Sequence, residues 1–443
     1  MHKTIENIVS LCKRRGFVFQ SSDIYGGFSA IYDYGPLGVE LKNNISKFWW
    51  KEMTHIHENI VGLDSGILMH PRIWEASGHI NAFNDPLVDC KKCKARYKAD
   101  EFSEQFSALN WTEIQCPKCG TKGNLTKPRQ FNLMFKTHVG PVKETGTEAY
   151  LRPETAQGIY VNYQLIQGAM RMKVPFGIAQ IGKAFRNEII ARNFIFRTRE
   201  FEQMEMQYFV KPGTDDQILE DWKEKRLHFY PRYLGINKSK LRFHQHKSSE
   251  LAHYAKKAWD IEYKFPFGWS EIEGIHNRTD YDLIQHEKFS GKNLSYFDQP
   301  NNERFLPYII ETSAGLNRML LTVLVDAYWE DTENNRIVMK LDPMIAPIKA
   351  VICPLTKKDG LPDKAREITN ILKSHFKVIY DQQGSIGKRY YRQDEAGTPF
   401  GITIDHQSLS DKTFTLRYRD TQKQDRLSID QIISIINKSL SLI

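Results

Sequence analysis

Residues 185–209, FRNEIIARNFIFRTREFEQMEMQYF, decide the fold. The second half alternates apolar and polar residues with the period of a half-buried strand, and the first half continues another strand. A basic turn joins the two, with Arg192, Arg197 and Arg199. Since residues two apart share one face of a sheet, Arg186 and Glu188 should project together. We therefore expect an antiparallel hairpin.

On the return strand of this hairpin, Phe201, Gln203 and Glu205 should share one face. An arginine fork beside carboxylates suits a nucleoside triphosphate with Mg²⁺. A salt-bridged hairpin with a solvated loop is the alternative interpretation of the same residues. The sequence has neither G-x-x-x-x-G-K-[ST] nor a G-x-G-x-x-G after a strand, so phosphates would need another cradle.

Three further polar clusters interrupt segments that otherwise resemble core: RPETAQG at 152–158, GWSEIEGIHNRTDYDLIQH at 268–286 and IETSAGLNRML at 310–320. Arg318 falls on the first turn of a predicted apolar helix, where a cation opposes the helix dipole and plausibly faces an anion instead. Buried-looking charges in four separate clusters need one another or a ligand as partners.

The flanking sequence extends this pattern in both directions. Residues 1–20 predict a helix that stops at Gly16, and VELKNNISKFWWKEM predicts an amphipathic helix after a Gly-, Tyr- and Pro-rich stretch. Alternation recurs in FGIAQIGKAF, which favours an antiparallel sheet. A boundary is expected near 341–347, LDPMIAP.

Beyond this boundary, strands and helices alternate. The expected elements are KAVICPL, a helix around Pro362 to Phe376, KVIYD, a polar Gly-containing segment, FGITID, TFTLRYR and a last helix from Ser428. This pattern predicts a small α/β domain with a parallel component.

Four of the six cysteines form two C-x-x-C pairs, Cys90 with Cys93 and Cys116 with Cys119. The second pair lies in CPKCG, whose proline and glycine favour the tight turn around a tetrahedral ion. We predict a structural zinc; a worn or redox-active relic is the alternative. Cys12 and Cys353 stand alone and are expected to be buried apolar residues.

Composition describes an ordinary globular protein of 443 residues, with 41% hydrophobic and 26% charged residues. It excludes a disordered chain. The 62 basic and 53 acidic residues give a net charge of +9, which slightly favours a phosphate-bearing partner. No apolar run is long enough for a membrane span, and the N-terminus does not read as a secretory signal, so a reducing compartment is expected.

Several segments together resemble the class II aminoacyl-tRNA synthetases. GPLGVELKNNISKFWW resembles motif 1 (near 35–50), residues 185–209 resemble motif 2, and GLNRMLL resembles motif 3 (310–325). More narrowly, YDYGPLGVELKNN, RPETAQGIY, FRTREFEQMEM and SIGKRYYRQDEAGTPF are similar to the dimeric type of glycyl-tRNA synthetase. The resemblance spans essentially the whole chain.

The resemblance implies an α/β (α+β) protein with a class II antiparallel-sheet catalytic domain at 1–345, a zinc-like insert at about 86–127 and an α/β anticodon-binding domain at 346–443. It implies a cytoplasmic homodimer, without membrane attachment, that activates glycine with ATP to glycyl-adenylate and transfers it to the 3′ end of tRNA(Gly).

The resemblance also implies individual roles. Arg186 would hold the α-phosphate and Arg318 the γ-phosphate, Phe201 would stack on adenine, and Glu188 and Glu271 would bind Mg²⁺; Arg186, Arg318 and Glu188 are the catalytic candidates. The other expected ATP-binding residues are Asn187, Phe196, Arg197, Thr198, Arg199, Glu200, Ile272, Gly315, Leu316 and Asn317. The expected glycine-binding residues are Glu154, Phe201, Glu202, Gln203, Met204, Glu205, Glu311, Thr312, Ser313, Ala314 and Gly315.

In SIGKRYYRQDEAGTPF, Lys388, Arg389 and Arg392 alternate with two tyrosines. This mixture of cations and aromatic rings suits unstacked bases, and its position in a synthetase-like chain favours tRNA contact over an ordinary solvated loop.

A few residues depart from the family pattern: Ile190, Ala191, Ser270, His276 and Asn317. Two rival functions remain. A noncatalytic, nucleic-acid-binding accessory subunit would be expected to lose the phosphate-binding arginines, which are intact here. A class II synthetase for another small amino acid would not explain the glutamate-rich segments, and a threonine enzyme would want zinc inside its catalytic pocket.

Overall fold

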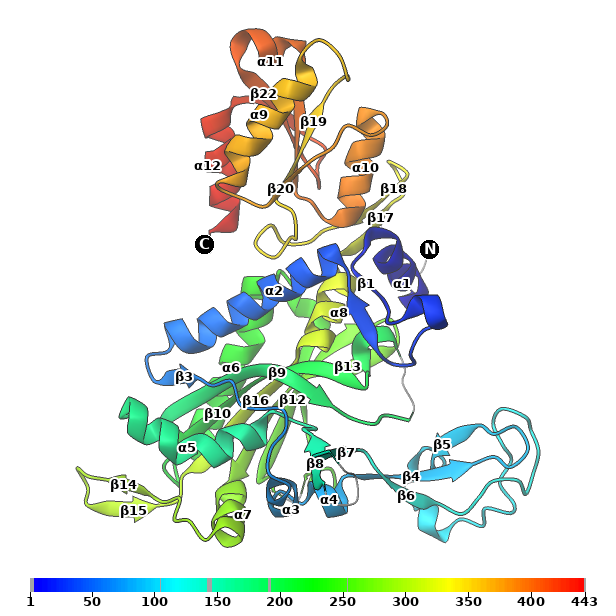
Figure 1. Cartoon of the computed structure of the whole chain (residues 1–443), viewed down its shortest axis with the longest axis vertical. Coiled ribbons are helices and arrows are strands. Elements are labelled where there is room, and N and C mark those ends of the chain that lie inside the picture. Colours follow the sequence, from blue (N-terminus) through cyan, green and yellow to red (C-terminus); the bar gives the residue numbers. More distant parts are fainter. Residues whose placement is uncertain (1–3, 104, 142–145, 190–192, 253, 442–443) are drawn as a thin grey trace.

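The computed structural model describes residues 4–103, 105–141, 146–189, 193–252 and 254–441. Ile190, Ala191 and Arg192 of the predicted turn lie outside the described residues. Figure 1 shows a large body built on a central sheet, a smaller α/β body at the C-terminal end, and an arm that projects from the large body.

The central sheet has seven strands in the order β11-β12-β13-β16-β10-β9-β3. All neighbours in it are antiparallel except β3 and β9. Their bounds are β3 Ile60–Gly62, β9 Phe176–Phe185, β10 Glu200–Val210, β11 Leu241–Gln245, β12 Lys257–Phe265, β13 Gly268–Thr279 and β16 Tyr308–Gly315. The predicted antiparallel hairpin of residues 185–209 is thus confirmed, although β9 ends at Phe185, before Arg186 and Glu188.

Two helices cover one face of this sheet, where α6 packs on β13 and β16 and α8 packs on β10, and α5 packs on β9 and β10 at the opposite face. The main helices of this body are α1 Ile5–Arg15, α2 Pro36–Lys51, α5 Ala156–Met170, α6 Asp215–Leu234, α7 Tyr281–Ser290 and α8 Leu316–Ala327. Leu41 and Trp49 of α2 join Met204 and Met319 in the main core. α1 ends at Gly16 with φ 72°, as predicted, because glycine adopts the left-handed conformation without strain.

Short hairpins and helices surround the sheet. The hairpins are β1 Val18–Gln20 with β2 Tyr32–Tyr34, β7 Phe135–Val139 with β8 Thr147–Leu151, β14 Tyr296–Asp298 with β15 Glu303–Phe305, and β17 Tyr328–Asp331 with β18 Arg336–Met339. Two helical segments, α3 Arg72–Ala76 and α4 His79–Ala82, lead into the arm. The arm contains β4 Asn84–Asp89, β5 Arg96–Lys98 and β6 Arg129–Asn132, and it has a small core of its own.

The C-terminal body has a five-stranded sheet in the order β20-β19-β21-β22-β23. Its first three strands are parallel and the remaining pairs antiparallel, which confirms the predicted parallel component. The elements are β19 Ala350–Pro354, α9 Leu361–Lys373, β20 Val378–Tyr380, α10 Ile386–Ala396, β21 Phe400–Ile404, α11 His406–Asp411, β22 Thr413–Tyr418, β23 Gln424–Ser428 and α12 Ile429–Leu440. A separate hydrophobic core lies between this sheet and its helices.

The expected polar, Gly-containing segment after KVIYD is partly wrong, because the structure forms helix α10 there. Ser385 caps its N-terminus by accepting a hydrogen bond from the backbone N–H of Lys388, and Gly397 ends it at φ 79°. Serine and glycine are common in loops, but here they mark the two ends of a helix, which composition alone does not distinguish from a loop.

Candidate active site

A cavity of about 220 Å³ lies on one face of the central sheet, over β10, β13 and β16. It collects residues from all four polar clusters found in the sequence. Its lining consists of Glu154, Arg186, Glu188, Ile195, Phe196, Arg197, Thr198, Phe201, Gln203, Glu205, Tyr254, Glu271, Gly274, His276, Arg278, Glu311, Ser313, Gly315, Asn317 and Arg318.

Strand alternation explains which of the residues expected to bind glycine reach the cavity. Phe201, Gln203 and Glu205 of β10 line it, as do Glu311 and Ser313 of β16. The residues between them face away from it, because successive side chains of a strand point to opposite faces. The predicted residues that do not line the cavity for this reason are Glu202, Met204, Thr312 and Ala314. Glu202 instead forms an ion pair with Lys42 of α2 at 2.6 Å.

The predicted ATP set is similarly divided. Phe196, Arg197, Thr198, Gly315 and Asn317 line the cavity. Five predicted residues are absent from the lining: Asn187, Arg199, Glu200, Ile272 and Leu316. Ile272 and Leu316 are instead fully buried in the main core.

A bulge in β13 decides the direction of Glu271. Glu262 of β12 pairs with Glu271 and Ile261 pairs with Glu273, so Ile272 is an extra residue. The bulge places Glu271 in the cavity and Glu273 on the opposite face, which α6 covers. There the buried Arg226 of α6 donates to Glu273 at 2.6 Å. Glutamates two apart would otherwise share a face.

Two arginines lie at the cavity with aromatic support. Arg186 lies 5.3 Å from the centre of the Phe201 ring, and its Nε donates to the carbonyl of Pro153 at 3.0 Å. Arg318 lies 4.4 Å from the centre of the Phe196 ring and forms an ion pair with Glu271 at 3.0 Å. Both planar guanidinium groups are therefore oriented before any anion binds.

Glu188 lines the same cavity and is 6% exposed. Its Oε2 has no hydrogen-bond partner among the described residues, and Arg197 lies 3.5 Å from it. An incompletely satisfied carboxylate oxygen in a cavity is a suitable ligand for a hard cation such as Mg²⁺.

Three glutamates lie on the other side of the cavity: Glu205 and Glu311 are buried, and Glu154 is partly buried. Glu205 accepts hydrogen bonds from Thr155 at 2.5 Å, from Ser313 at 2.6 Å and from Gln203 at 2.9 Å. Burial and the carboxylates of Glu311 and Glu154 nevertheless raise the pKa of Glu205 to about 7. These donors help to hold a negative charge that burial opposes.

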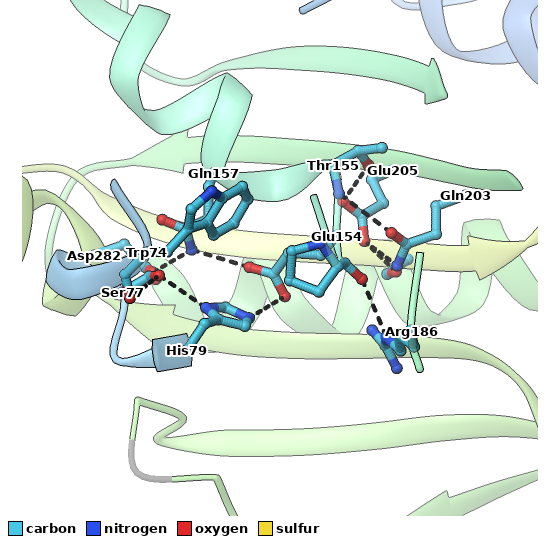
Figure 2. A network of polar contacts seen from close by, with 12 residues as sticks. Trp74, Ser77, His79, Glu154, Thr155, Gln157, Arg186, Gln203, Glu205 and Asp282 are labelled. Atoms are coloured by element: carbon cyan, nitrogen blue, oxygen red, sulfur yellow. Dashed lines mark hydrogen bonds and ion pairs between the residues drawn. The ribbon is translucent and has the colours of Figure 1, made fainter. Parts of the chain in front are cut away.

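Glu311 and Glu154 each form ion pairs with cationic or histidine side chains. Burial opposes ionisation of Glu311, but Arg278 at 3.1 Å and His276 at 3.2 Å outweigh it and lower its pKa to about 2. For Glu154, burial is outweighed by His79, Arg278 and Gln157, and its pKa lies well below the usual value. Figure 2 shows Glu154 between His79 and Gln157, close to Glu205 and Arg186.

Sequence reasoning missed three contributors to this site. Arg278 and Asp282 belong to the quoted 268–286 segment but were not singled out; Arg278 bridges Asp282 at 2.8 Å and Glu311 at 3.1 Å. Tyr254 comes from a stretch without a recognisable motif and lies 3.8 Å from Arg278, measured to the ring centre. Ser270 is absent from the cavity lining, whereas His276 and Asn317, noted as departures, line it.

The four cysteines of the arm come together as their spacing predicts. Their four Sγ atoms all lie within 4.8 Å of one another. The Tyr97 hydroxyl lies 3.4 Å from Cys116 Sγ and is the main cause of the lowered pKa of that thiol. A compact set of four thiols, of which Cys116 and Cys119 have a lowered pKa, fits a tetrahedral zinc ion. Cys12 and Cys353 are fully buried, which confirms their prediction.

The predicted tRNA contacts in the C-terminal body need one correction. Arg389 is only 3% exposed, and its guanidinium donates to the carbonyls of Pro354 and Gly384. It therefore supports the fold from inside. Lys388 and Tyr391 are exposed, and the partly exposed Arg392 forms an ion pair with Asp381.

Family models match two parts of the chain. Residues 130–327 match the tRNA synthetase class II core domain (G, H, P, S and T), and residues 349–439 match an anticodon binding domain. The sheet and its cavity are therefore those of a class II tRNA synthetase core.

Curated relatives narrow the class further. The chain is 59% identical over 448 residues to a glycine–tRNA ligase of Treponema denticola, covering 99% of this chain and 98% of the relative. It is 56% identical to that of Borrelia hermsii (98% and 97% covered) and 50% identical to that of Thermobifida fusca (99% and 98% covered). The chain belongs to the glycine–tRNA ligase family. None of its described helices is long and apolar enough to cross a membrane.

Proposed function

We propose that the cavity activates glycine with ATP and that the enzyme then transfers the glycyl group to tRNA(Gly). Membership of the glycine–tRNA ligase family makes this chain an aminoacyl-tRNA ligase. One observation carries the proposal to the level of residues: one cavity is lined by two oriented arginines and by the glutamates Glu154, Glu205 and Glu311. The first group suits the phosphates of a nucleotide, and the second suits an ammonium group.

The reaction needs positioning and charge neutralisation rather than a protein nucleophile. A carboxylate oxygen of glycine attacks the α-phosphorus of ATP, and the bond to the leaving pyrophosphate breaks. A hydroxyl of the terminal ribose of tRNA then attacks the glycyl carbonyl, and AMP leaves. In this proposal Arg186 neutralises the α-phosphate, Arg318 holds the γ-phosphate, and Phe201 stacks on adenine.

Glu188 and Glu271 are the carboxylates proposed to hold Mg²⁺. Glu188 contributes its Oε2, which has no hydrogen-bond partner in the part of the chain that the structure describes, and the side chain of Glu271, which lines the cavity, is 46% exposed. When bound there, Mg²⁺ would supply positive charge to the triphosphate.

The glycine ammonium is proposed to bind among Glu154, Glu205 and Glu311. Gln203 and Ser313 fill the space beside Glu205, to which both donate. A filled pocket rejects larger amino acids by steric exclusion, so no editing site is required.

Zinc is proposed as a structural ion bound by Cys90, Cys93, Cys116 and Cys119. Protein purified without chelator should contain one zinc per chain, because a closed four-thiolate site binds zinc tightly. Elemental analysis checks this. Less than about a tenth of that amount, in protein with reduced thiols, would contradict the site.

We further propose a domain division at residue 345, tRNA contact by Lys388 and Arg392, a cytoplasmic location and a homodimer. Support for the division comes from the separate cores on its two sides and from the anticodon-binding match at 349–439. The dimer rests on the resemblance to the dimeric synthetase type, and light scattering on purified protein tests it.

Aminoacylation with labelled glycine tests the proposed function. With ATP, Mg²⁺ and tRNA, the purified protein should place glycine in acid-precipitable RNA through an alkali-labile ester. Reactions without ATP and with Arg186→Ala are the controls. Failure of the wild-type protein to charge tRNA in this assay would contradict the proposal.

A further inference from the structure

Glu154 is held on one side by a histidine that precedes it by 75 residues in the chain. Nε2 of His79 lies 3.5 Å from Oε2 of Glu154, which is an ion-pair distance. Gln157 donates to the other carboxylate oxygen at 3.0 Å. Figure 2 shows the two partners approaching the carboxylate from α4 and α5, so both oxygens are oriented.

His79 is itself fixed by its surroundings. Its Nδ1 lies 2.8 Å from the Ser77 hydroxyl, and its ring makes edge contacts with Trp74 and Phe83. A neutral ring that accepts from Ser77 and a protonated ring that donates to it both leave an N–H on Nε2. The remaining tautomer would place a lone pair against the carboxylate. The geometry therefore favours an N–H directed at Glu154.

Glu154 needs such support because other carboxylates surround it. The titratable groups that act on it or respond to its charge come from six segments: His79, Arg278, Glu205, Glu311, Tyr160 and Tyr254. Burial opposes the ionisation of Glu154. Among the groups that outweigh burial and lower the pKa of Glu154, His79 has the largest effect. Arg278 is shared with Asp282 and Glu311, whereas within the described part of the chain His79 forms an ion pair with Glu154 alone.

We propose that His79 is a positioning residue of the glycine site, which holds the Glu154 carboxylate ionised and turned toward the substrate ammonium. The inference rests on the proposed function, in which Glu154 binds that ammonium. His79 does not line the cavity and acts only through Glu154. Ser77 and the two aromatic rings hold the histidine in place.

Glycine-dependent ATP–pyrophosphate exchange tests the proposal. His79→Ala should raise KM for glycine at least about 10-fold, because a contact to a buried charge is lost, while KM for ATP changes less than about two-fold. Since Glu154 is proposed to contact the glycine ammonium and not ATP, the effect should be confined to KM for glycine. A purely structural residue would change KM for both substrates.

A double-mutant cycle with Glu154→Gln separates the possible failures. If His79 acts through Glu154, adding His79→Ala to Glu154→Gln should change KM for glycine less than about two-fold. His406→Ala, which removes another histidine–carboxylate pair, is the matched control. If His79→Ala does not fold, His79→Gln replaces it in the same cycle.

Each outcome of the cycle decides one point. An unchanged KM in His79→Ala, with a raised KM in Glu154→Gln, would overturn the role of His79 alone. An unchanged KM in Glu154→Gln would contradict the assignment of Glu154 in the proposed function. Additive effects of the two substitutions would show that His79 acts by another route and would also overturn the inference.

Discussion

Arginines lie against carboxylates both in the cavity and where β17 and β18 meet the C-terminal body. The two regions differ in how many of these charged groups have a protein partner. At the junction, Asp394 of α10 is 1% exposed and accepts from Arg336 of β18 at 2.7 Å and from Arg417 of β22 at 2.8 and 2.9 Å. Asp331 accepts from Arg336 at 2.8 Å. These side chains close on one another.

Around the cavity, pairing is incomplete. Among the described residues Oε2 of Glu188 has no hydrogen-bond partner, and burial together with the neighbouring carboxylates raises the pKa of Glu205 to about 7. A fully paired group of buried charges holds a fold together, whereas buried charges left around a cavity are completed by a ligand. The difference separates a structural network from a binding site that contains the same residue types.

Removing Asp394 should produce the largest effect, and that effect should be on stability. Asp394→Ala leaves two buried guanidinium groups without their shared carboxylate, so the free energy of unfolding should fall by about 3 to 5 kcal/mol. Chemical denaturation measures this, with the exposed Asp359→Ala as control. Glycine-dependent exchange at 25 °C should remain within a few-fold of wild type. A folded Asp394→Ala protein without exchange activity would erase the distinction between the two networks.

Removing Arg186 should have the opposite profile. Arg186→Ala should lower adenylate formation at least about 100-fold, because a preorganised charge at the reacting phosphate is lost, with a small change in stability. Arg304→Ala is the matched control, since Arg304 also lies over a phenylalanine ring, 4.8 Å from its centre, and is absent from the cavity lining. Wild-type exchange in a folded Arg186→Ala protein would contradict its assignment.

The unfinished pairing of Glu205 predicts proton release on glycine binding. Near pH 7 about half of this group carries a proton, and an ammonium beside it favours the ionised form, so its pKa falls. Calorimetric titration with glycine in buffers of different ionisation enthalpy should reveal release of about half a proton at pH 7 and less at pH 8.5. Enthalpies independent of the buffer at pH 7 would show that the ammonium binds elsewhere.

The smallest effect is expected on the surface of α10. Lys388→Ala should raise KM for tRNA a few-fold and reduce the salt slope of binding by about one, because one phosphate contact is lost. Its buried neighbour supplies the control: Arg389→Lys should lower stability without changing that slope. The reverse result would mean that α10 rearranges when tRNA binds.

The sequence predicted those features that depend on regular spacing. The antiparallel hairpin followed from alternation in residues 200–210, the cysteine cluster from two C-x-x-C pairs, and the end of α1 from Gly16. It did not predict α10, in which the polar residues Arg389, Gln393 and Asp394 are buried beside Tyr390 and Ala396. Hydrophobic periodicity cannot detect a helix that buries paired polar groups.

Contacts distant in the chain set the remaining limits. The extra residue Ile272 reverses the expected direction of Glu273, and nothing in the local sequence marks that bulge. His79 and Tyr254 reach the site region only through the fold, from segments that carry no motif. Site residues on strands with regular alternation could be predicted from the sequence. His79 and Tyr254, which come from other segments, could not.

The central claim is that Glu154, Glu205 and Glu311 bind the ammonium of glycine in a pocket that leaves no room for a larger amino acid. The most direct measurement is amino-acid-dependent ATP–pyrophosphate exchange by the wild-type protein with each of the twenty amino acids. Glycine should exceed every other amino acid, including alanine, by at least about 100-fold in kcat/KM, because steric exclusion from a filled pocket is strong. Comparable exchange with alanine, serine or threonine, or no exchange with glycine, would contradict the account.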